Sequence, residues 1–231
     1  MFSLLRFIRH FVTILLVLGF AQLNISLVPP PVEAHTDISF GEHPRQSMDI
    51  YYPRKAKNVK SPVGAFLFIH GGSWIAGSKE EYRMFAIPMA REGYVTATTA
   101  YRFIPRSPDA EGFTVADMME DIGLAIAKLK ETAAADGIEI NKIALSGDSA
   151  GGHLALLYAY THLNGTDNAP AIPIAFVIGR VAPTDVHLDD SMDNSVLNAV
   201  TADAPPTILC YATNDELVFP ERHGFPLREK L

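Results

Sequence analysis

The sequence contains a single cysteine, Cys210, in 231 residues. This excludes an internal disulfide framework and any zinc site built from several cysteines. Basic residues are also scarce, because 19 Lys and Arg stand against 26 Asp and Glu for a formal net charge of −7. Such a balance is unsuited to tracking a phosphate backbone, so we expect no nucleic-acid partner. None of the 8 histidines has ligand spacing with other candidates, and we expect no metal and no cofactor.

A long hydrophobic run is missing as well. The apolar stretch over residues 11–21 is interrupted by Gln22 and Asn24, so it falls short of the roughly 20 residues that a membrane-spanning helix needs. Arg6 and Arg9 precede this stretch. A basic start followed by a short apolar run is typical of a secretory signal peptide.

Two positions offer a signal cleavage site. Residues 32–34 (VEA) fit a small-x-small site, and residues 19–21 (GFA) offer a second one. The alternative is an uncleaved anchor, against which the prolines at positions 29–31 argue, because they would break a continuing helix. We expect residues 1–34 to be a signal peptide or an N-terminal anchor. The protein is then exported (secreted or periplasmic), or associated with a membrane through its N-terminus.

Residues 35–231 have the length and composition of one folded domain. Hydrophobic residues make up 48% of the chain and charged residues 19%, which excludes a disordered chain. The 16 glycines and 16 prolines are close to ordinary usage, so collagen-like and low-complexity classes are excluded as well.

Strand and helix patterns alternate along this domain. Residues 65–70 (AFLFIH) form a continuous apolar run, which predicts a strand buried on both faces. Residues 55–60 form a basic loop. Further strands are predicted at residues 47–52, 94–101, 142–145, 174–178 and 207–211, and helices at 78–91, 115–132 and 150–162. This order predicts an α/β fold with a mostly parallel sheet and helices on both faces.

The start and the end of the first helix carry local signals. Residues 78–81 (SKEE) predict a capping box at its N-terminus. Pro88 lies inside the helix and predicts a kink or an early end. Gly93 fits the position just beyond its last turn.

The strongest functional signal follows the strand at residues 142–145. Residues 147–152 (GDSAGG) place Ser149 in a G-x-S-x-G motif between a strand and a helix, the context that supports this motif. Gly147 and Gly151 leave room where a Cβ would strike the neighbouring chain. We therefore predict that Ser149 is a nucleophile in a strained turn, with the helix N-terminus directed at the site.

A second glycine motif follows the buried strand at residues 65–70. His70 is followed by Gly71 and Gly72, whose unshielded N–H groups can point at a small anion. A serine attacking a carbonyl creates a negative oxygen that needs such donors. Gly71, Gly72 and Ala150 are therefore the predicted oxyanion hole. His70 is expected to brace this loop, and Trp74 either lines the pocket or covers the core.

The pair HGGSW and GDSAGG resembles the α/β-hydrolase superfamily, specifically the esterases related to hormone-sensitive lipase and the bacterial feruloyl/acetyl esterase-like group. Residues 48–53 (MDIYYP), 100–102 (AYR), 149–155 (SAGGHLA) and 213–215 (TND) resemble the same group. The likeness covers roughly residues 47–231. It implies the α/β-hydrolase fold and a catalytic triad in the chain order serine, acid, histidine.

The position of Asp215, after the strand at residues 207–211, resembles that of the acid in this family. Asp215 would then orient and stabilise the histidine. Asp185, after the preceding strand, is the alternative, because some lipases use an acid at that place. We favour Asp215.

The histidine is where the sequence departs from the family. The resemblance implies one more helix and one more strand before it, often with a His-Gly-Phe context. Residues 223–225 (HGF) look like this motif, yet they follow Asp215 closely, and residues 218–231 look more like the helix after the acid. We expect the last strand to be missing and the domain over residues 35–231 to be incomplete at its C-terminus. Whether His223 is the base, or the base is absent, stays open; His153 is expected to pack beneath Ser149.

The resemblance and motifs together predict a serine hydrolase that cleaves carboxylic esters through an acyl-enzyme on Ser149. The substrate would be a small-molecule or carbohydrate-borne ester. Two alternatives stay open, namely a truncated and weak or inactive hydrolase, and a serine peptidase or amidase of the same fold. Residues 181–203 follow a strand and carry no Lys, but several acids, which form either an acidic rim or a solvated loop: Asp185, Asp189, Asp190, Asp193 and Asp203.

Overall fold

The computed structural model describes residues 32–53, 63–105 and 112–231. They belong to one compact unit from Val32 to Leu231. Most of the predicted signal peptide and the predicted basic loop at residues 55–60 lie outside the described residues. Within the described ranges, no helix has both the length and the apolar character needed to cross a bilayer.

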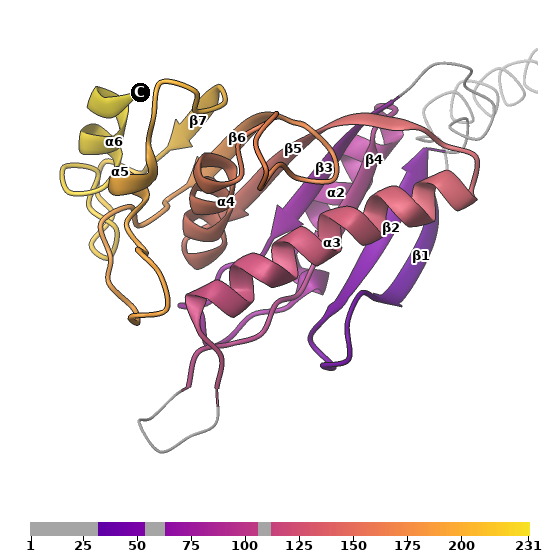
Figure 1. Ribbon diagram of the computed structural model, residues 1–231, viewed down its shortest axis with the longest axis horizontal. Helices are drawn as coiled ribbons and strands as arrows, with labels where there is room; N and C mark the ends of the chain where they lie inside the picture. The colour runs from indigo at the N-terminus through magenta and orange to yellow at the C-terminus, as the bar shows by residue number, and fades with distance from the viewer. Residues whose placement is uncertain (1–31, 54–62, 106–111) are drawn as a thin grey trace, which may run out of the picture. The chain divides into compact units, whose positions relative to one another are not determined.

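One sheet of 7 strands in the described chain runs in the order β1-β2-β4-β3-β5-β6-β7 (Figure 1). Strands β3 to β7 pair in parallel, whereas β2 pairs antiparallel with both β1 and β4. The mostly parallel sheet confirms the predicted fold class. The strands are β1 (Val32–Ser39), β2 (Ser47–Pro53), β3 (Val63–Ile69), β4 (Val95–Thr99), β5 (Ile140–Asp148), β6 (Ile174–Arg180) and β7 (Thr207–Cys210).

Helices cover both faces of this sheet. In Figure 1, α3 and α4 lie in front of the strands and α2 lies behind them. The helical elements are η2 (Lys79–Tyr82), α2 (Arg83–Arg91), α3 (Val115–Ala135), α4 (Ala150–Thr161), α5 (Val196–Ala199) and α6 (Gly224–Lys230).

Strand β3 shows why the central apolar run is continuous. Its alternate residues Ala65, Leu67 and Ile69 belong to the core cluster that also contains side chains of α3 and α4. Phe66 and Phe68 point to the other face and pack in the cluster that contains side chains of α2. Both faces are therefore buried, as predicted for a central parallel strand.

The predicted helix starts at residues 115 and 150 are confirmed, but the predicted capping box at residues 78–81 was wrong. Ser78 precedes η2 in an extended conformation and makes no side-chain capping bond, because this segment begins with a 3-10 turn rather than a regular helical turn. The capping box forms instead at Thr114, whose main-chain N–H donates to Asp117 Oδ2 at 2.8 Å while its hydroxyl accepts from the Asp117 N–H at 3.2 Å. Gly93 follows α2 with a φ of 108°, as its predicted role requires.

Strand β1 includes the end of the segment that we predicted to be a signal peptide. Val32, Glu33 and Ala34 pair with Pro53, Tyr52 and Tyr51 of β2. Cleavage after Ala34 would therefore remove the first part of this edge strand. The signal peptide itself stays a prediction, because residues 1–31 lie outside the described chain.

Strand β7 forms the opposite edge of the sheet. It pairs with β6 alone, and Ile208 on it is 49% exposed. Within the described chain, α6 follows β7 and no further strand does. Within the described residues the sheet therefore ends at β7, and the lack of a last strand stays a prediction.

A buried ion-pair network ties β2 to η2. Asp49 is fully buried, and its carboxylate accepts hydrogen bonds from Lys79 Nζ at 2.6 Å and from Arg83 Nη2 at 2.8 Å. Burial acts to raise the pKa of Asp49, but the hydrogen bonds from Lys79, the Asp37 N–H and Arg83 outweigh it and lower this pKa below its ordinary value. The network is therefore charged at neutral pH.

We expect Lys79→Met to lower the free energy of unfolding by about 3–5 kcal/mol, because Asp49 would stay buried without its closest cation. Urea unfolding at pH 7 measures this change. The matched control is Lys128→Met, which removes an exposed ion pair with Glu131 and should cost less than about 1 kcal/mol. If the two variants were equally stable, the Lys79–Asp49 ion pair would not contribute to stability as we expect.

The same network sets a pH dependence. Since the pKa of Asp49 is lowered on folding, its contribution is complete above the unfolded value of about 3.9 and is lost as the pH falls through the lower folded value. Wild-type stability should therefore decrease below pH ~4, with a smaller decrease in Asp49→Asn.

Candidate active site

Ser149 lies at the junction of β5 and α4, where the chain turns sharply. Its φ of 49° and ψ of −121° place a non-glycine residue in a strained conformation, which costs on the order of 1–3 kcal/mol and persists only where the surroundings enforce it. Such strain at the end of a central strand is a common feature of functional sites. The predicted sharp turn at Ser149 is therefore confirmed in its geometry.

Glycines make this turn possible by close main-chain contact. A Cβ on Gly147 would lie 2.3 Å from the Gly151 carbonyl oxygen. A Cβ on Gly151 would lie 2.2 Å from the carbonyl oxygen of Ile69, which ends β3. The start of α4 therefore packs directly on the backbone of β3, so Ser149 and the loop after β3 share one small volume.

The loop after β3 brings its glycines beside Ser149. A Cβ on Gly71 would lie 3.5 Å from the Ser149 Cβ and 2.9 Å from the Asp148 carbonyl oxygen. Gly72 follows with a φ of 118°, and its carbonyl accepts the Ala76 N–H at 2.9 Å. Ala150 is the first residue of α4, so its N–H has no partner within the helix. The three predicted oxyanion donors thus come from two segments that meet at Ser149.

The His70 side chain holds the loop after β3 through hydrogen bonds of its two ring nitrogens. Arg45 Nη2 donates to His70 Nε2 at 3.1 Å, and the other ring nitrogen, Nδ1, donates to the Gly71 carbonyl at 2.7 Å. The ring stacks on Tyr101 at a centroid distance of 4.4 Å. Burial lowers the pKa of His70 to about 4, so the ring is neutral at pH 7 and both its nitrogens are engaged. Sequence reasoning anticipated this bracing role but missed Arg45, which carries no local motif.

His153 lies in the turn that follows Ser149, and its main-chain N–H donates to the Ser149 carbonyl at 2.9 Å. It is fully buried in the first turn of α4. The Trp74 indole N–H donates to its Nδ1 at 3.2 Å, and its Nε2 donates to the Asn194 carbonyl at 2.7 Å. Burial lowers its pKa to about 4. His153 is therefore a neutral packing residue, as predicted, and Trp74 packs against it.

Asp215 lies in an exposed turn after β7. Its carboxylate accepts the N–H groups of Leu217 at 2.9 Å and Val218 at 2.8 Å. These main-chain bonds lower its pKa below the ordinary value. Among the described residues, no histidine nitrogen lies within hydrogen-bond distance of this carboxylate. The structure thus gives Asp215 a local turn-forming role and brings no base to it.

His223 precedes α6 and packs against the loop after β6. Its Nδ1 accepts the Thr184 N–H at 3.1 Å and the Asp185 N–H at 3.4 Å. A base in a triad needs the reverse arrangement, in which Nδ1 donates to an acid and Nε2 faces the serine. Burial and Arg222 lower the pKa of His223, and the Asp185 carboxylate opposes them. Asp185, the alternative acid, therefore lies beside His223. No contact among the described residues links the Asp185 carboxylate to Ser149.

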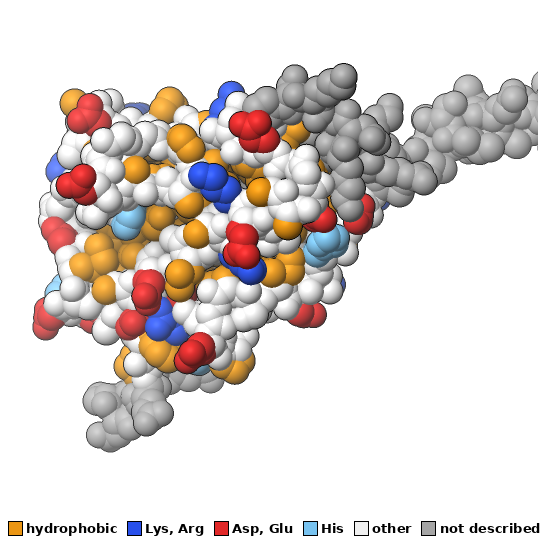
Figure 2. Space-filling view, turned by 45° about the vertical axis from the view of Figure 1, so that its right-hand side comes forward, with side chains coloured by type: hydrophobic (Ala, Val, Ile, Leu, Met, Phe, Trp, Pro, Cys, Tyr) orange, Lys and Arg blue, Asp and Glu red, His pale blue; other side chains and the backbone are white. Residues whose placement is uncertain are grey.

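Two aspartates of the acidic segment at residues 181–203 accept main-chain N–H groups of the chain. Asp189 Oδ2 accepts the Val115 N–H at the start of α3 at 2.8 Å. Asp193 accepts the N–H of Ser195 at 2.9 Å. Figure 2 shows acidic and basic side chains scattered singly over one face of the molecule, with hydrophobic side chains between them. The contacts of Asp189 and Asp193 favour the loop interpretation over an acidic rim.

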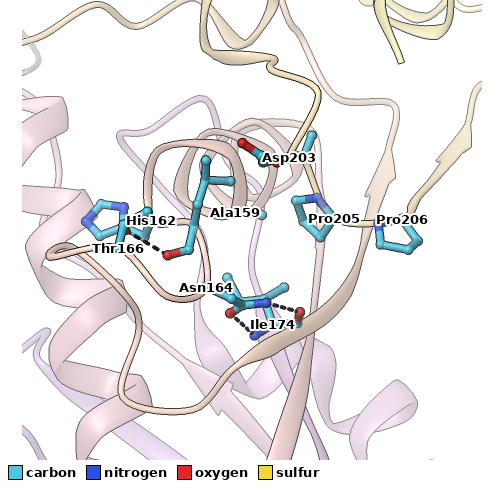
Figure 3. A pocket seen from close by; sticks show the side chains of 10 residues that line it. Ala159, His162, Asn164, Thr166, Ile174, Asp203, Pro205 and Pro206 are labelled. Atoms are coloured by element: carbon cyan, nitrogen blue, oxygen red, sulfur yellow. Dashed lines mark hydrogen bonds between the residues drawn. The ribbon is translucent and has the colours of Figure 1, made fainter.

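A pocket of about 370 Å³ lies at the opposite end of the strands from Ser149. It is bounded by the last turn of α4, by Asn164 in the loop after α4, by Ile174 at the start of β6, and by Pro205 and Pro206 before β7 (Figure 3). The Asn164 side chain bonds both main-chain groups of Ile174 at 2.9 Å. The Asn164 amide therefore closes the loop between α4 and β6 and has no polar atom left without a partner for a ligand. The described residues contain no group of three or more side chains suited to a metal ion.

Comparison with known proteins places these features in a family. Residues 48–199 match the BD-FAE family. The chain is 32% identical over 178 residues to "Probable isoprenylcysteine alpha-carbonyl methylesterase ICMEL1" of Oryza sativa subsp. japonica, covering 74% of this chain and 40% of that protein. It is 26% identical over 149 residues to the kynurenine formamidase of Danio rerio, covering 63% and 45%. The chain therefore spans less than half the length of these curated relatives.

A solved structure gives the same architecture. Thermogutta terrifontis esterase 2, phosphoramylated by tabun, superposes with a TM-score of 0.68 at 23% identity, covering 87% of this chain and 78% of that one. At this identity the likeness establishes the fold, which is the α/β-hydrolase fold. The fold class implied by the sequence motifs is thereby confirmed.

We expect Gly151→Ala to lower the free energy of unfolding by about 1–3 kcal/mol, because the new methyl group would overlap the carbonyl oxygens of Ile69 and His70. The control is Gly64→Ala on β3, where the nearest atom lies at an ordinary 3.4 Å. Thermal unfolding of the two variants gives the comparison. If Gly151→Ala were as stable as Gly64→Ala, the close packing of α4 on β3 would be wrong.

Proposed function

The chain belongs to the BD-FAE family, and from this membership we propose that it hydrolyses carboxylic esters through an acyl-enzyme on Ser149. The observation that carries the proposal is the strained Ser149 at the start of α4, with Gly71 packed beside it. This arrangement supports a nucleophile held next to main-chain donors. The named relatives include an esterase and a methylesterase, which supports the reaction class.

In the proposed reaction, Ser149 Oγ attacks the ester carbonyl carbon. An Oγ–C bond forms, and the carbonyl oxygen takes on a negative charge that the N–H groups of Gly71, Gly72 and Ala150 stabilise. The bond from carbon to the alcohol oxygen then breaks, and the alcohol leaves with a proton. Water attacks the acyl-enzyme, so that the carboxylic acid is released and the Ser149 hydroxyl is restored.

The serine proton needs an acceptor during the first step. The carboxylate of Asp215 and the Nδ1 of His223 are both engaged by main-chain N–H groups, so neither is free for the role that the resemblance implies. Oxyanion donors and binding without a complete triad leave only roughly 10³–10⁴-fold acceleration over water in other serine hydrolases. We therefore infer that this chain by itself acylates Ser149 slowly, which keeps the weak or inactive hydrolase as the second candidate.

We expect a fluorophosphonate probe to label the wild type slowly and Ser149→Ala not at all. In this reaction the Oγ–P bond forms, the P–F bond breaks, and fluoride departs while the hydroxyl proton passes to water. Labelling of the purified full chain followed by peptide mapping measures the site and the rate. An unlabelled wild type would overturn the proposal in favour of an inactive hydrolase.

Two further variants belong to the same assay. His223→Ala and Asp215→Asn should both label at the wild-type rate, within about twofold, because the contacts above bind these side chains to the main chain. A loss of ten times or more in either variant would instead assign that residue to the reaction.

The acyl group should be short. The segment at residues 181–203 is brief for a lid over the site, and two of its aspartates, Asp189 and Asp193, fix it by accepting main-chain N–H groups. We expect acetyl and butyryl nitrophenyl esters to turn over faster than dodecanoyl esters in initial-rate measurements. A matched anilide tests the amidase alternative that the formamidase relative suggests, and faster anilide than ester cleavage would favour it.

A further inference from the structure

Arg180, the last residue of β6, touches the main chain of the candidate nucleophile. It lies opposite Asp148 in the parallel register of β5 and β6. Its carbonyl oxygen accepts the Ser149 N–H at 2.9 Å. The peptide that leads into the strained residue is therefore fixed by Arg180 rather than by a bond within α4.

The Arg180 side chain reaches the same segment from the side of α2. Its Nε donates to the Asp148 carboxylate, and its Nη1 donates to the Ser146 hydroxyl at 2.7 Å. The guanidinium carbon lies 4.8 Å from the centre of the Phe85 ring on α2. Ser146 and Asp148 alternate along β5, so one guanidinium spans the two side chains that precede Ser149 on that face of the sheet.

The glycine contacts act on the other face. Leu145 and Gly147, which alternate with Ser146 and Asp148 along β5, face the layer of α4, where Leu145 packs in the core and Gly147 touches Gly151. The turn at Ser149 is thus held by close packing on the α4 side and by Arg180 on the α2 side. Removing either hold would let the strained φ of Ser149 relax.

The guanidinium is not fully satisfied where it lies. Its Nη2 is buried and has no hydrogen-bond partner in the described part of the chain. A buried donor without a partner lowers stability. The arginine at position 180 therefore lowers the free energy of unfolding through this unpaired donor, and packing does not explain why an arginine is present. A role in holding the geometry of Ser149 does explain it.

We propose that Arg180 is a positioning residue that holds Ser149 in its reactive conformation, through its carbonyl on the Ser149 N–H and its guanidinium on Asp148 and Ser146. The catalytic part of this inference rests on the proposed function of Ser149. The positioning residue touches no substrate; it acts through the Asp148–Ser149 peptide. A displacement of Oγ or of the Ala150 N–H by about 1 Å is enough to slow the chemical step by on the order of 100-fold.

Fluorophosphonate inactivation tests the inference when it is resolved into an affinity (KI) and a maximal rate (kinact). We expect Arg180→Met to lower kinact about 10–100-fold while KI changes less than threefold, because the methionine keeps the stem over Phe85 but loses every donor. Arg180→Lys should recover part of kinact, since one ammonium reaches Asp148 but cannot span Ser146 as well.

The matched control is Arg83→Met. Arg83, the first residue of α2, likewise makes two side-chain donations, but both go to Asp49 on β2, at 3.3 and 2.8 Å, and not to β5. This variant should keep kinact within twofold. All variants are assayed well below their unfolding midpoints, so that a general loss of stability appears in the midpoint and not in kinact.

Amide hydrogen exchange of the Asp148–Gly151 segment separates this inference from the proposed function. We expect Arg180→Met to speed exchange of the Ser149 amide more than tenfold relative to Arg83→Met. If the wild type does not label but this exchange effect is present, the proposed function is overturned and the hold of Arg180 on Ser149 is supported. Unchanged kinact in a labelling protein, or unchanged exchange, would overturn the positioning role.

Discussion

The constraint on which the site depends is the contact between two stretches of backbone at Ser149. The start of α4 lies so close to the end of β3 that a single methyl group at Gly151 would overlap carbonyl oxygens of Ile69 and His70. This approach forces Ser149 to a φ of 49° and sets Gly71 beside it. Because the strain is local, the surrounding contacts must supply the energy that maintains it.

Two neutral histidines contribute much of that support. His70 is fixed by Arg45, Tyr101 and the Gly71 carbonyl, and His153 is fixed by Trp74 and Asn194. Burial lowers the pKa of both to about 4, so neither brings a charge to the site near neutral pH. They act as rigid hydrogen-bonded spacers between the central strands and the loops that surround Ser149.

The candidate acid and base, Asp215 and His223, behave differently because they follow the strand at the edge of the sheet. β3 and β5 each have a strand on both sides, whereas β7 pairs with β6 alone. The loop after β7 is fixed mainly by its own short-range bonds, such as those of Asp215 to Leu217 and Val218. His223 likewise accepts main-chain N–H groups. The candidate nucleophile is thus preorganised by the core, while the candidate acid and base are not brought together.

The sequence by itself determined the features whose causes lie within a few residues. The continuous apolar run gave β3, and the glycines around Ser149 indicated the sharp turn, because each depends on side-chain size or hydrophobicity nearby. Tertiary structure alone decided the partners that lie far apart in the chain. The contacts of Arg45 with His70 and of Arg180 with Ser149 follow from strand register and packing. No local pattern encodes these contacts, since they form only when strands distant in sequence become neighbours in the sheet.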